Sequence, residues 1–170
     1  MKLALPFPEA LSLATAEKPL PAVIRSVDCV GETLHAEIDL RALPTRSTVL
    51  RLAAAAAGTV TVTARFVGYT EGVAKFLVTA HARNLPAHKL LPYLLDPVEN
   101  AMRERGLPEG LLQIQPGAAG PLVLIDAQKA IRTRASGVTV TSLQLRDAVI
   151  HAEATIGTVR LHRPHQAGPS

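Results

Sequence analysis

The longest hydrophobic pattern in the chain runs through residues 85–106. Its apolar residues recur at the three- and four-residue spacing of a helix. At 100° per residue they fall within an arc of about 140°, which is wide enough to cover a sheet. The pattern predicts a long amphipathic helix whose buried stripe consists of Ala87, Leu90, Leu91, Leu94, Leu95, Val98, Ala101 and Met102.

Two prolines, Pro92 and Pro97, interrupt this helical pattern away from its apolar arc. Each proline removes a backbone donor and crowds the preceding turn. One interpretation is a continuous helix that bends with its convex side toward solvent. The other breaks the helix at Asp96, so that Pro97 begins a second segment and Glu99 completes a capping box. We favour the two-segment interpretation, in which Gly106 ends the second segment.

Polar and apolar residues alternate elsewhere, as they do in strands with one face toward water. The clearest case is residues 33–40, where Leu34 and Ala36 alternate with His35 and Glu37. Together with turn signals and β-branched residues, this alternation predicts eight strands, at residues 22–30, 33–40, 59–69, 73–82, 111–115, 121–125, 138–146 and 149–156. Shorter helices are predicted at residues 45–57, which are rich in alanine, and from an Asp126 cap to Arg134.

These elements follow one another as strand, strand and helix, which predicts an α+β fold. We expect a mostly antiparallel, curved sheet of about eight strands, with the two-segment amphipathic helix packed on it. Residues 26–40 and 142–156 share a His-Ala-Glu triplet. This internal similarity indicates either a duplication or a coincidence that reflects the limited number of ways to build a hairpin. We expect a proline-bearing lead at residues 1–21, a single domain at residues 22–161 and a flexible tail at residues 162–170.

Composition adds limits on stability and location. The chain has 170 residues and 48% hydrophobic content, enough for one core without disulfides, and Cys29 is its only cysteine. The net charge is +4, and the basic residues are spread along the chain. The apolar N-terminal residues resemble a secretory signal, but Pro6, Pro8 and Glu9 interrupt them. We therefore expect a soluble cytoplasmic protein, with secretion or envelope association as the alternative.

The most distinctive polar pattern is the repeated His-Ala-Glu triplet. His35 and Glu37 lie on one face of a predicted strand, as do His151 and Glu153 on another. If the two strands were neighbours, these groups could bind zinc or iron. A hydrated sheet face also explains the alternation, and we favour it. Because the sequence contains no phosphate loop, nucleophile elbow or paired-carboxylate motif, we expect no enzyme activity, catalytic residue, metal site or cofactor.

Nucleic-acid binding is a weaker alternative for the basic residues. Aromatic residues make up 3% of the chain, so few platforms are available for base stacking. Contacts with a phosphate backbone remain open to Arg41, Arg46, Arg51, Arg132 and Arg134.

The apolar residues give the strongest indication of function. The wide helix stripe faces a predicted strand that carries Ala74, Ala80 and Ala82, where a filled core would often place larger groups. Such a mismatch can leave a groove for an acyl chain. The groove candidates are Phe76, Val78, Ala80, Leu90, Leu91, Leu94, Leu95, Val98 and Met102.

Residues 83–157 carry a resemblance that points the same way. They contain, in order, the runs KLLPYLL, GLPEG, PLVLID and VTVTSLQLRDAVIHAEA. This order of elements resembles the LmeA-type phospholipid-binding proteins of bacteria and, more loosely, the tubular lipid-binding folds. The resemblance implies lipid binding and export, and it transfers no individual ligand residue.

We therefore predict a non-catalytic protein that binds an apolar or lipid-like ligand or an anionic membrane surface. The alternative is an interaction or structural protein with a basic surface, which could include association with nucleic acid. The oligomeric state is left open by these patterns.

Overall fold

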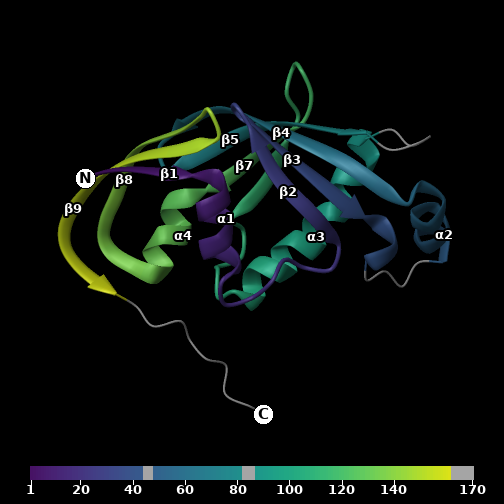
Figure 1. Ribbon diagram of the computed structural model, residues 1–170, viewed down its shortest axis with the longest axis horizontal. Coiled ribbons are helices and arrows are strands. Elements are labelled where there is room, and N and C mark those ends of the chain that lie inside the picture. Colours follow the sequence, from purple (N-terminus) through teal and green to yellow (C-terminus); the bar gives the residue numbers. More distant parts are fainter. Residues whose placement is uncertain (44–47, 82–86, 162–170) are drawn as a thin grey trace, which may run out of the picture.

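Six strands form the larger of two sheets in the computed structural model, which describes residues 1–43, 48–81 and 87–161 (Figure 1). All neighbouring strands in it are antiparallel. Turns at Gly31 and Gly72, both with positive φ, join its first two strand pairs. The order across the sheet is β2 (Ile24–Val30), β3 (Thr33–Asp39), β4 (Thr59–Thr70), β5 (Val73–His81), β7 (Leu122–Asp126) and β6 (Leu112–Gln115).

A second, three-stranded sheet has the order β1 (Lys2–Pro6), β9 (Val149–Leu161) and β8 (Ala135–Arg146). The α+β class and the antiparallel pairing are confirmed, but the expected single sheet of about eight strands is wrong. Alternation shows which residues share a face of one strand, whereas strand neighbours depend on contacts far apart in the chain. The two sheets meet at a hairpin turn, where the Ala148 N–H donates to the Gly31 carbonyl at 2.9 Å.

The first strand and helix lie within the expected proline-bearing lead. β1 pairs with β9, from Lys2 opposite Glu153 to Pro6 opposite Val149. Helix α1 (Phe7–Thr15) follows directly, with a proline in its first turn, where the missing N–H costs little. The expected tail at residues 162–170 lies outside the described residues.

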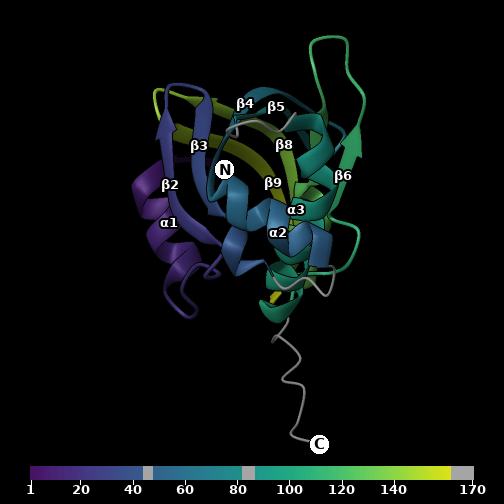
Figure 2. The same ribbon diagram turned by 90° about the vertical axis from the view of Figure 1, so that its right-hand side faces the viewer.

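Three further helices and one 3-10 turn complete the fold. They are α2 (Thr48–Ala57), α3 (Ala87–Glu104), α4 (Ala127–Arg134) and the turn η1 (Leu40–Ala42). Figures 1 and 2 show α1, α3 and α4 on the hollow side of the arched strands, while α2 lies near one end of the larger sheet. The predicted cap of α4 is confirmed, because the Asp126 carboxylate accepts the Lys129 N–H at 2.7 Å.

Helix α3 runs without a break through Pro92 and Pro97, so the two-segment prediction is wrong. Each interior proline costs roughly 3 kcal/mol of helix stability. Burial of the apolar stripe offsets this cost: Leu94 is only 6% exposed and packs in a cluster with Val60 and Ala80. A continuous helix keeps that stripe in one line over the sheet.

The end of α3 follows the prediction. Gly106 adopts a φ of 72°, and its N–H donates to the Arg103 carbonyl at 2.8 Å. The Leu107 N–H donates to the Met102 carbonyl at 3.0 Å. This pair of bonds is a Schellman motif, which glycine allows because it has no Cβ to clash in the left-handed region.

The main core cluster lies where α2 and α3 meet the end of the larger sheet. Val60 is fully buried, and Leu40 is 2% exposed beside it. Ala54 and Ala57 of α2 also belong to this cluster. Small side chains let a helix backbone sit near the strands.

The two hairpins that carry the repeated triplet are β2–β3 and β8–β9, and they belong to different sheets. Nothing in this arrangement supports a duplication. Among the described residues, no helix combines the length and apolar character needed to span a membrane.

Candidate apolar ligand site

The inner face of the larger sheet is apolar across five strands. The register places its residues in cross-strand rows, for example Cys29, Leu34, Ala64 and Val78 on successive strands. We define the inner face as Val27, Cys29, Leu34, Ala36, Ile38, Val60, Val62, Ala64, Phe66, Ala74, Phe76, Val78, Ala80, Val123 and Ile125. None of these residues carries a charge.

Helices cover the inner face unevenly. Val60, Val78 and Ala80 are buried, and α3 packs along β5. Ala36 and Ala64, on β3 and β4, remain partly exposed. The incompletely covered part of the face therefore lies over the middle of β3 and β4, between β5, which α3 covers, and β2, which α1 contacts.

Two aromatic rings lie on the inner face, at the side toward β7. Phe66 and Phe76 are direct cross-strand partners, and their ring centroids are 5.5 Å apart at an interplanar angle of 70°. Such an edge-to-face pair stabilises the sheet beyond its buried area. Both rings are only partly buried, so they add to the apolar surface open to a ligand.

The predicted groove residues whose surroundings the structure describes lie on β5 and α3, and Val78 and Ala80 of β5 are buried. Phe76, Val78 and Ala80 share the inner face of β5, as expected from their alternation. On α3, Leu94 is buried, whereas Leu95, Val98 and Met102 are half-buried. Leu90 and Leu91 lie within α3, but their side-chain surroundings, like residue Ala82, fall outside the described part of the chain.

The prediction missed the contribution of β3 and β4. Val62, Ala64 and Phe66 alternate with threonine and arginine along β4, so the same period-2 signal was present in the sequence. Which sheet face the helix would cover depends on tertiary packing, and the sequence pattern did not reveal it.

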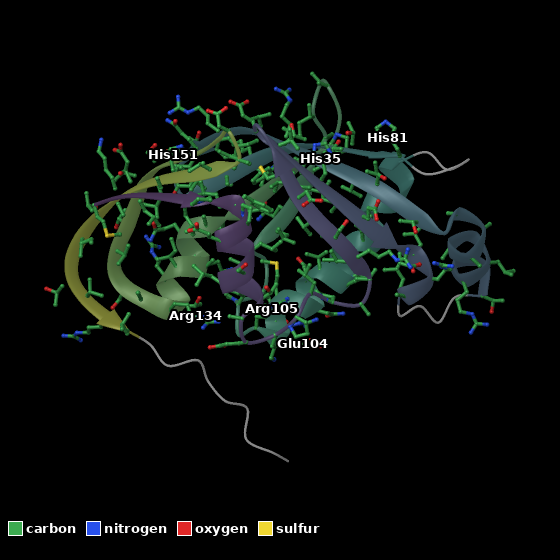
Figure 3. The ribbon with its side chains drawn as sticks, viewed as in Figure 1. His35, His81, Glu104, Arg105, Arg134 and His151 are labelled. Atoms are coloured by element: carbon green, nitrogen blue, oxygen red, sulfur yellow. The ribbon has the colours of Figure 1, made fainter. Side chains whose placement is uncertain are left out.

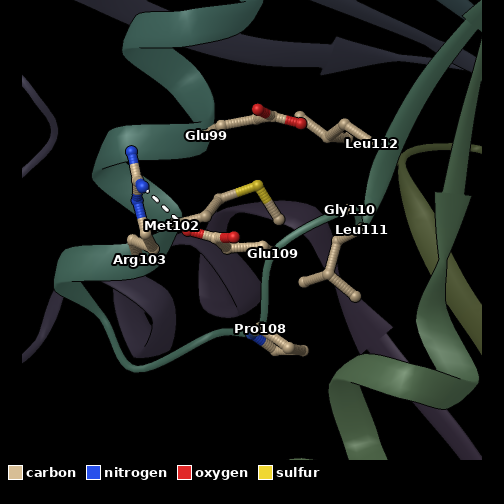
Figure 4. A pocket seen from close by; sticks show the side chains of 8 residues that line it. All are labelled: Glu99, Met102, Arg103, Pro108, Glu109, Gly110, Leu111 and Leu112. Atoms are coloured by element: carbon tan, nitrogen blue, oxygen red, sulfur yellow. Dashed lines mark hydrogen bonds and ion pairs between the residues drawn. The ribbon is translucent and has the colours of Figure 1, made fainter.

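A pocket of about 340 Å³ opens between the last turns of α3 and the start of β6 (Figure 4). Its apolar wall comes from Met102, Pro108, Leu111 and Leu112. Glu99 and Met102 extend from α3 toward the strand side of the pocket. The remaining lining residues are Arg103, Glu109 and Gly110.

Three cationic side chains tie the carboxyl end of α3 to its surroundings. The Lys18 ammonium donates to the Glu104 carbonyl at 2.5 Å, and Arg134 donates to the Arg105 carbonyl at 2.5 Å. Arg105 itself donates to the Pro19 carbonyl at 2.7 Å. Figure 3 shows Glu104, Arg105 and Arg134 gathered at the lower edge of the molecule. These cations neutralise the negative end of the α3 dipole, which explains their position without a ligand.

The outer face of the larger sheet is polar over β3 and β4. His35 stands between Asp28 and Thr63 in the cross-strand register, and the hydroxyls of Thr63 and Thr79 hydrogen-bond to each other. This is the hydrated sheet face that the alternation indicates.

The two His-Ala-Glu triplets do not come together. His35 and Glu37 lie on β3 of the larger sheet, whereas His151 and Glu153 lie on β9 of the smaller one (Figure 3). Glu153 instead pairs with Lys2 at 3.0 Å. The described residues contain no group of three or more potential ligands that could hold a metal ion.

Two titratable groups near the inner face are affected by burial. Desolvation raises the pKa of the Cys29 thiol, so the neutral form is favoured. Desolvation and the nearby Asp126 carboxylate raise the pKa of Tyr69, whose hydroxyl donates to the Val140 carbonyl at 3.2 Å.

Comparisons with protein-family models, with curated proteins and with solved structures find no match to this chain.

Proposed function

We propose that this protein binds an apolar or lipid-like ligand on the inner face of the larger sheet and catalyses no reaction. One observation carries the proposal: the uncharged inner face is incompletely covered, and its exposed part includes small residues such as Ala36 and Ala64. Each methylene group that a ligand buries there contributes about 0.8 kcal/mol. An acyl chain is the simplest ligand that matches an uncharged, incompletely covered surface.

The basic character of the chain adds a preference between membranes. A net charge of +4 favours anionic over neutral bilayers, and added salt weakens this attraction. The order of elements that resembles the LmeA-type phospholipid-binding proteins supports the same class of ligand.

Native mass spectrometry of freshly purified protein tests the proposal. Adducts of lipid mass are expected on the wild type. Ala64→Phe should remove them, because the ring fills space on the inner face. Thr61→Phe is the matched control, since it places the same ring on the outer face of the same strand and should leave the adducts in place. The absence of adducts on the wild type, together with no binding to anionic vesicles at low salt, would instead favour an interaction protein.

The single cysteine offers an independent measurement. Cys29 lies partly buried on the inner face, in the same cross-strand row as Leu34 and Ala64. A bound acyl chain should slow the reaction of its thiol with a maleimide. An unchanged rate in the presence of saturating lipid would count against a ligand over β2 and β3.

A further inference from the structure

Two carboxylates, Glu99 and Glu109, line the pocket between α3 and β6, and they differ in their ion pairing. Glu109 pairs with Arg103, with 2.8 Å between its Oε1 and the guanidinium Nη1. The Lys129 ammonium also approaches this loop, donating to the Glu109 carbonyl at 2.8 Å. Glu99, in contrast, forms no ion pair with any residue that the structure describes.

The side chain of Glu99 is placed to meet a ligand. It is half-buried and extends from α3 across the pocket toward Leu112 (Figure 4). Met102, one turn further along α3, extends in the same direction, and Leu111 is 2% exposed on the opposite wall. Glu99 therefore extends toward an apolar wall of the pocket, while Arg103 and Glu109, which pair with each other, form part of the rest of its lining.

The charges around the pocket favour a cation over an anion. Arg103 is already held by Glu109 and by the Asn100 side chain, so a new anion would have to displace these partners. The same anion would also meet Glu99.

The lining also distinguishes between kinds of cation. None of the described residues that line the pocket is aromatic, so they offer no π face of the kind that recognises quaternary ammonium groups. A carboxylate instead forms strong, charge-assisted hydrogen bonds with N–H donors. We propose that this pocket binds the primary ammonium group of an amphipathic ligand, with Glu99 as its counter-ion and Met102, Leu111 and Leu112 against its apolar part.

This inference rests on the proposed function, because it assigns the polar end of a ligand whose apolar end would reach the inner face. Leu112 connects the two regions, since it lines the pocket and pairs in register with Ile125 of the inner face. A volume of about 340 Å³ is at the lower end of the range for ligand sites, so the pocket suits a head group and a few methylene groups.

Isothermal titration with three probes of equal chain length tests the charge preference. Octylammonium should bind the wild type at least tenfold more tightly than 1-octanol or octanoate, since one charge-assisted hydrogen bond corresponds to about a tenfold change in affinity. Equal affinities for the three probes would overturn the proposal without the need for any variant.

Substitutions on α3 assign the preference to a residue. Glu99→Gln should reduce octylammonium affinity about tenfold and leave 1-octanol binding unchanged, and Glu99→Asp should retain part of the preference. Glu104→Gln is the matched control: it removes a carboxylate from the same helix at an exposed position outside the pocket, and it should change neither affinity. A preference that survives Glu99→Gln would refute the role of Glu99.

Vesicles separate a lipid head group from a free amine. If the source is a lipid, vesicles containing phosphatidylethanolamine, with a primary ammonium, should bind more tightly than phosphatidylcholine vesicles, and Glu99→Gln should abolish the difference. Octylammonium selectivity without any difference between the vesicles would identify a free amine as the ligand. Lipid adducts that persist while octylammonium shows no selectivity would refute this inference and leave the proposed function standing.

Discussion

Gln128 of α4 completes the hydrogen bonding of an edge strand, and its removal should destabilise the fold. β8 is at the edge of the smaller sheet, so backbone groups on its open side have no neighbouring strand in the described part of the chain. The Gln128 amide replaces that strand: its Nε2 donates to the Val138 carbonyl at 2.9 Å, and its Oε1 accepts the Val140 N–H at 2.8 Å. Gln128 is also 7% exposed, so water cannot readily take its place.

Gln128→Met keeps the side-chain length and removes both hydrogen bonds. It leaves one carbonyl and one N–H without partners, each costing about 1–3 kcal/mol when buried. Because both backbone groups are only partly buried, we expect a loss of about 2–4 kcal/mol in the free energy of unfolding. For a chain of this size that corresponds to a fall of roughly 4–16 °C in the melting temperature.

Urea unfolding followed by circular dichroism measures this loss. Gln144→Met is the matched control, since it makes the same change at an exposed position of β8, the strand that Gln128 contacts. The control should stay within about 0.5 kcal/mol of the wild type. Equal stability of the two variants would refute the idea that the Gln128 amide acts as a strand partner.

Three further predictions concern stability. Leu94→Ala should lower the free energy of unfolding by about 2–5 kcal/mol in urea titrations, because Leu94 is buried against the sheet, whereas the exposed Asp96→Ala should change it by less than about 1 kcal/mol. Ala148→Gly should raise the melting temperature, since Ala148 has a φ of 57° and relief of that conformation is worth about 1 kcal/mol. The Arg41 side chain hydrogen-bonds to Asp39 and holds the pKa of that carboxyl below its ordinary value of 3.8. Asp39 therefore stabilises the fold above that value and loses its effect as the pH falls, so the stability difference between the wild type and Asp39→Asn should shrink on titration from about pH 6 to pH 3.

Local signals in the sequence predicted the elements that local physics determines. Gly106 ends α3 because glycine tolerates positive φ, and Asp126 begins α4 because its carboxylate accepts a free N–H. The hairpins β2–β3, β4–β5 and β8–β9 follow from alternation and short turns in the same way. Each of these features depends on residues within a few positions of one another.

The division into two sheets depends on contacts across the whole chain, and for this reason the sequence did not reveal it. β1 lies near residue 1 and pairs with β9 near residue 150, and only tertiary packing brings them together. The continuity of α3 has a similar cause. Pro97 satisfies a local rule for starting a helix after Asp96, but burial of the stripe around Leu94 determines the outcome.

The candidate site was predictable in part for the same reason. Alternation placed Phe76, Val78 and Ala80 on one face of β5, and the register confirms that they share it. The role we propose for Glu99 was hidden, because the two-segment interpretation assigned it to a capping box. In a continuous helix Glu99 has no helix start to cap, and it lines the pocket.

The net positive charge and the carboxylate in the pocket should act over different ranges, and salt can separate them. Charges spread over the surface act on a membrane through solvent, where the Debye length is about 8 Å at physiological ionic strength. An ammonium group against Glu99 would be in direct contact inside a half-buried pocket, where screening is weaker. Raising the salt concentration from about 0.05 M to 0.5 M should therefore weaken binding to anionic vesicles more than it weakens the preference for octylammonium over octanoate. Parallel loss of both would mean that the preference for the cation arises at the surface and not at Glu99.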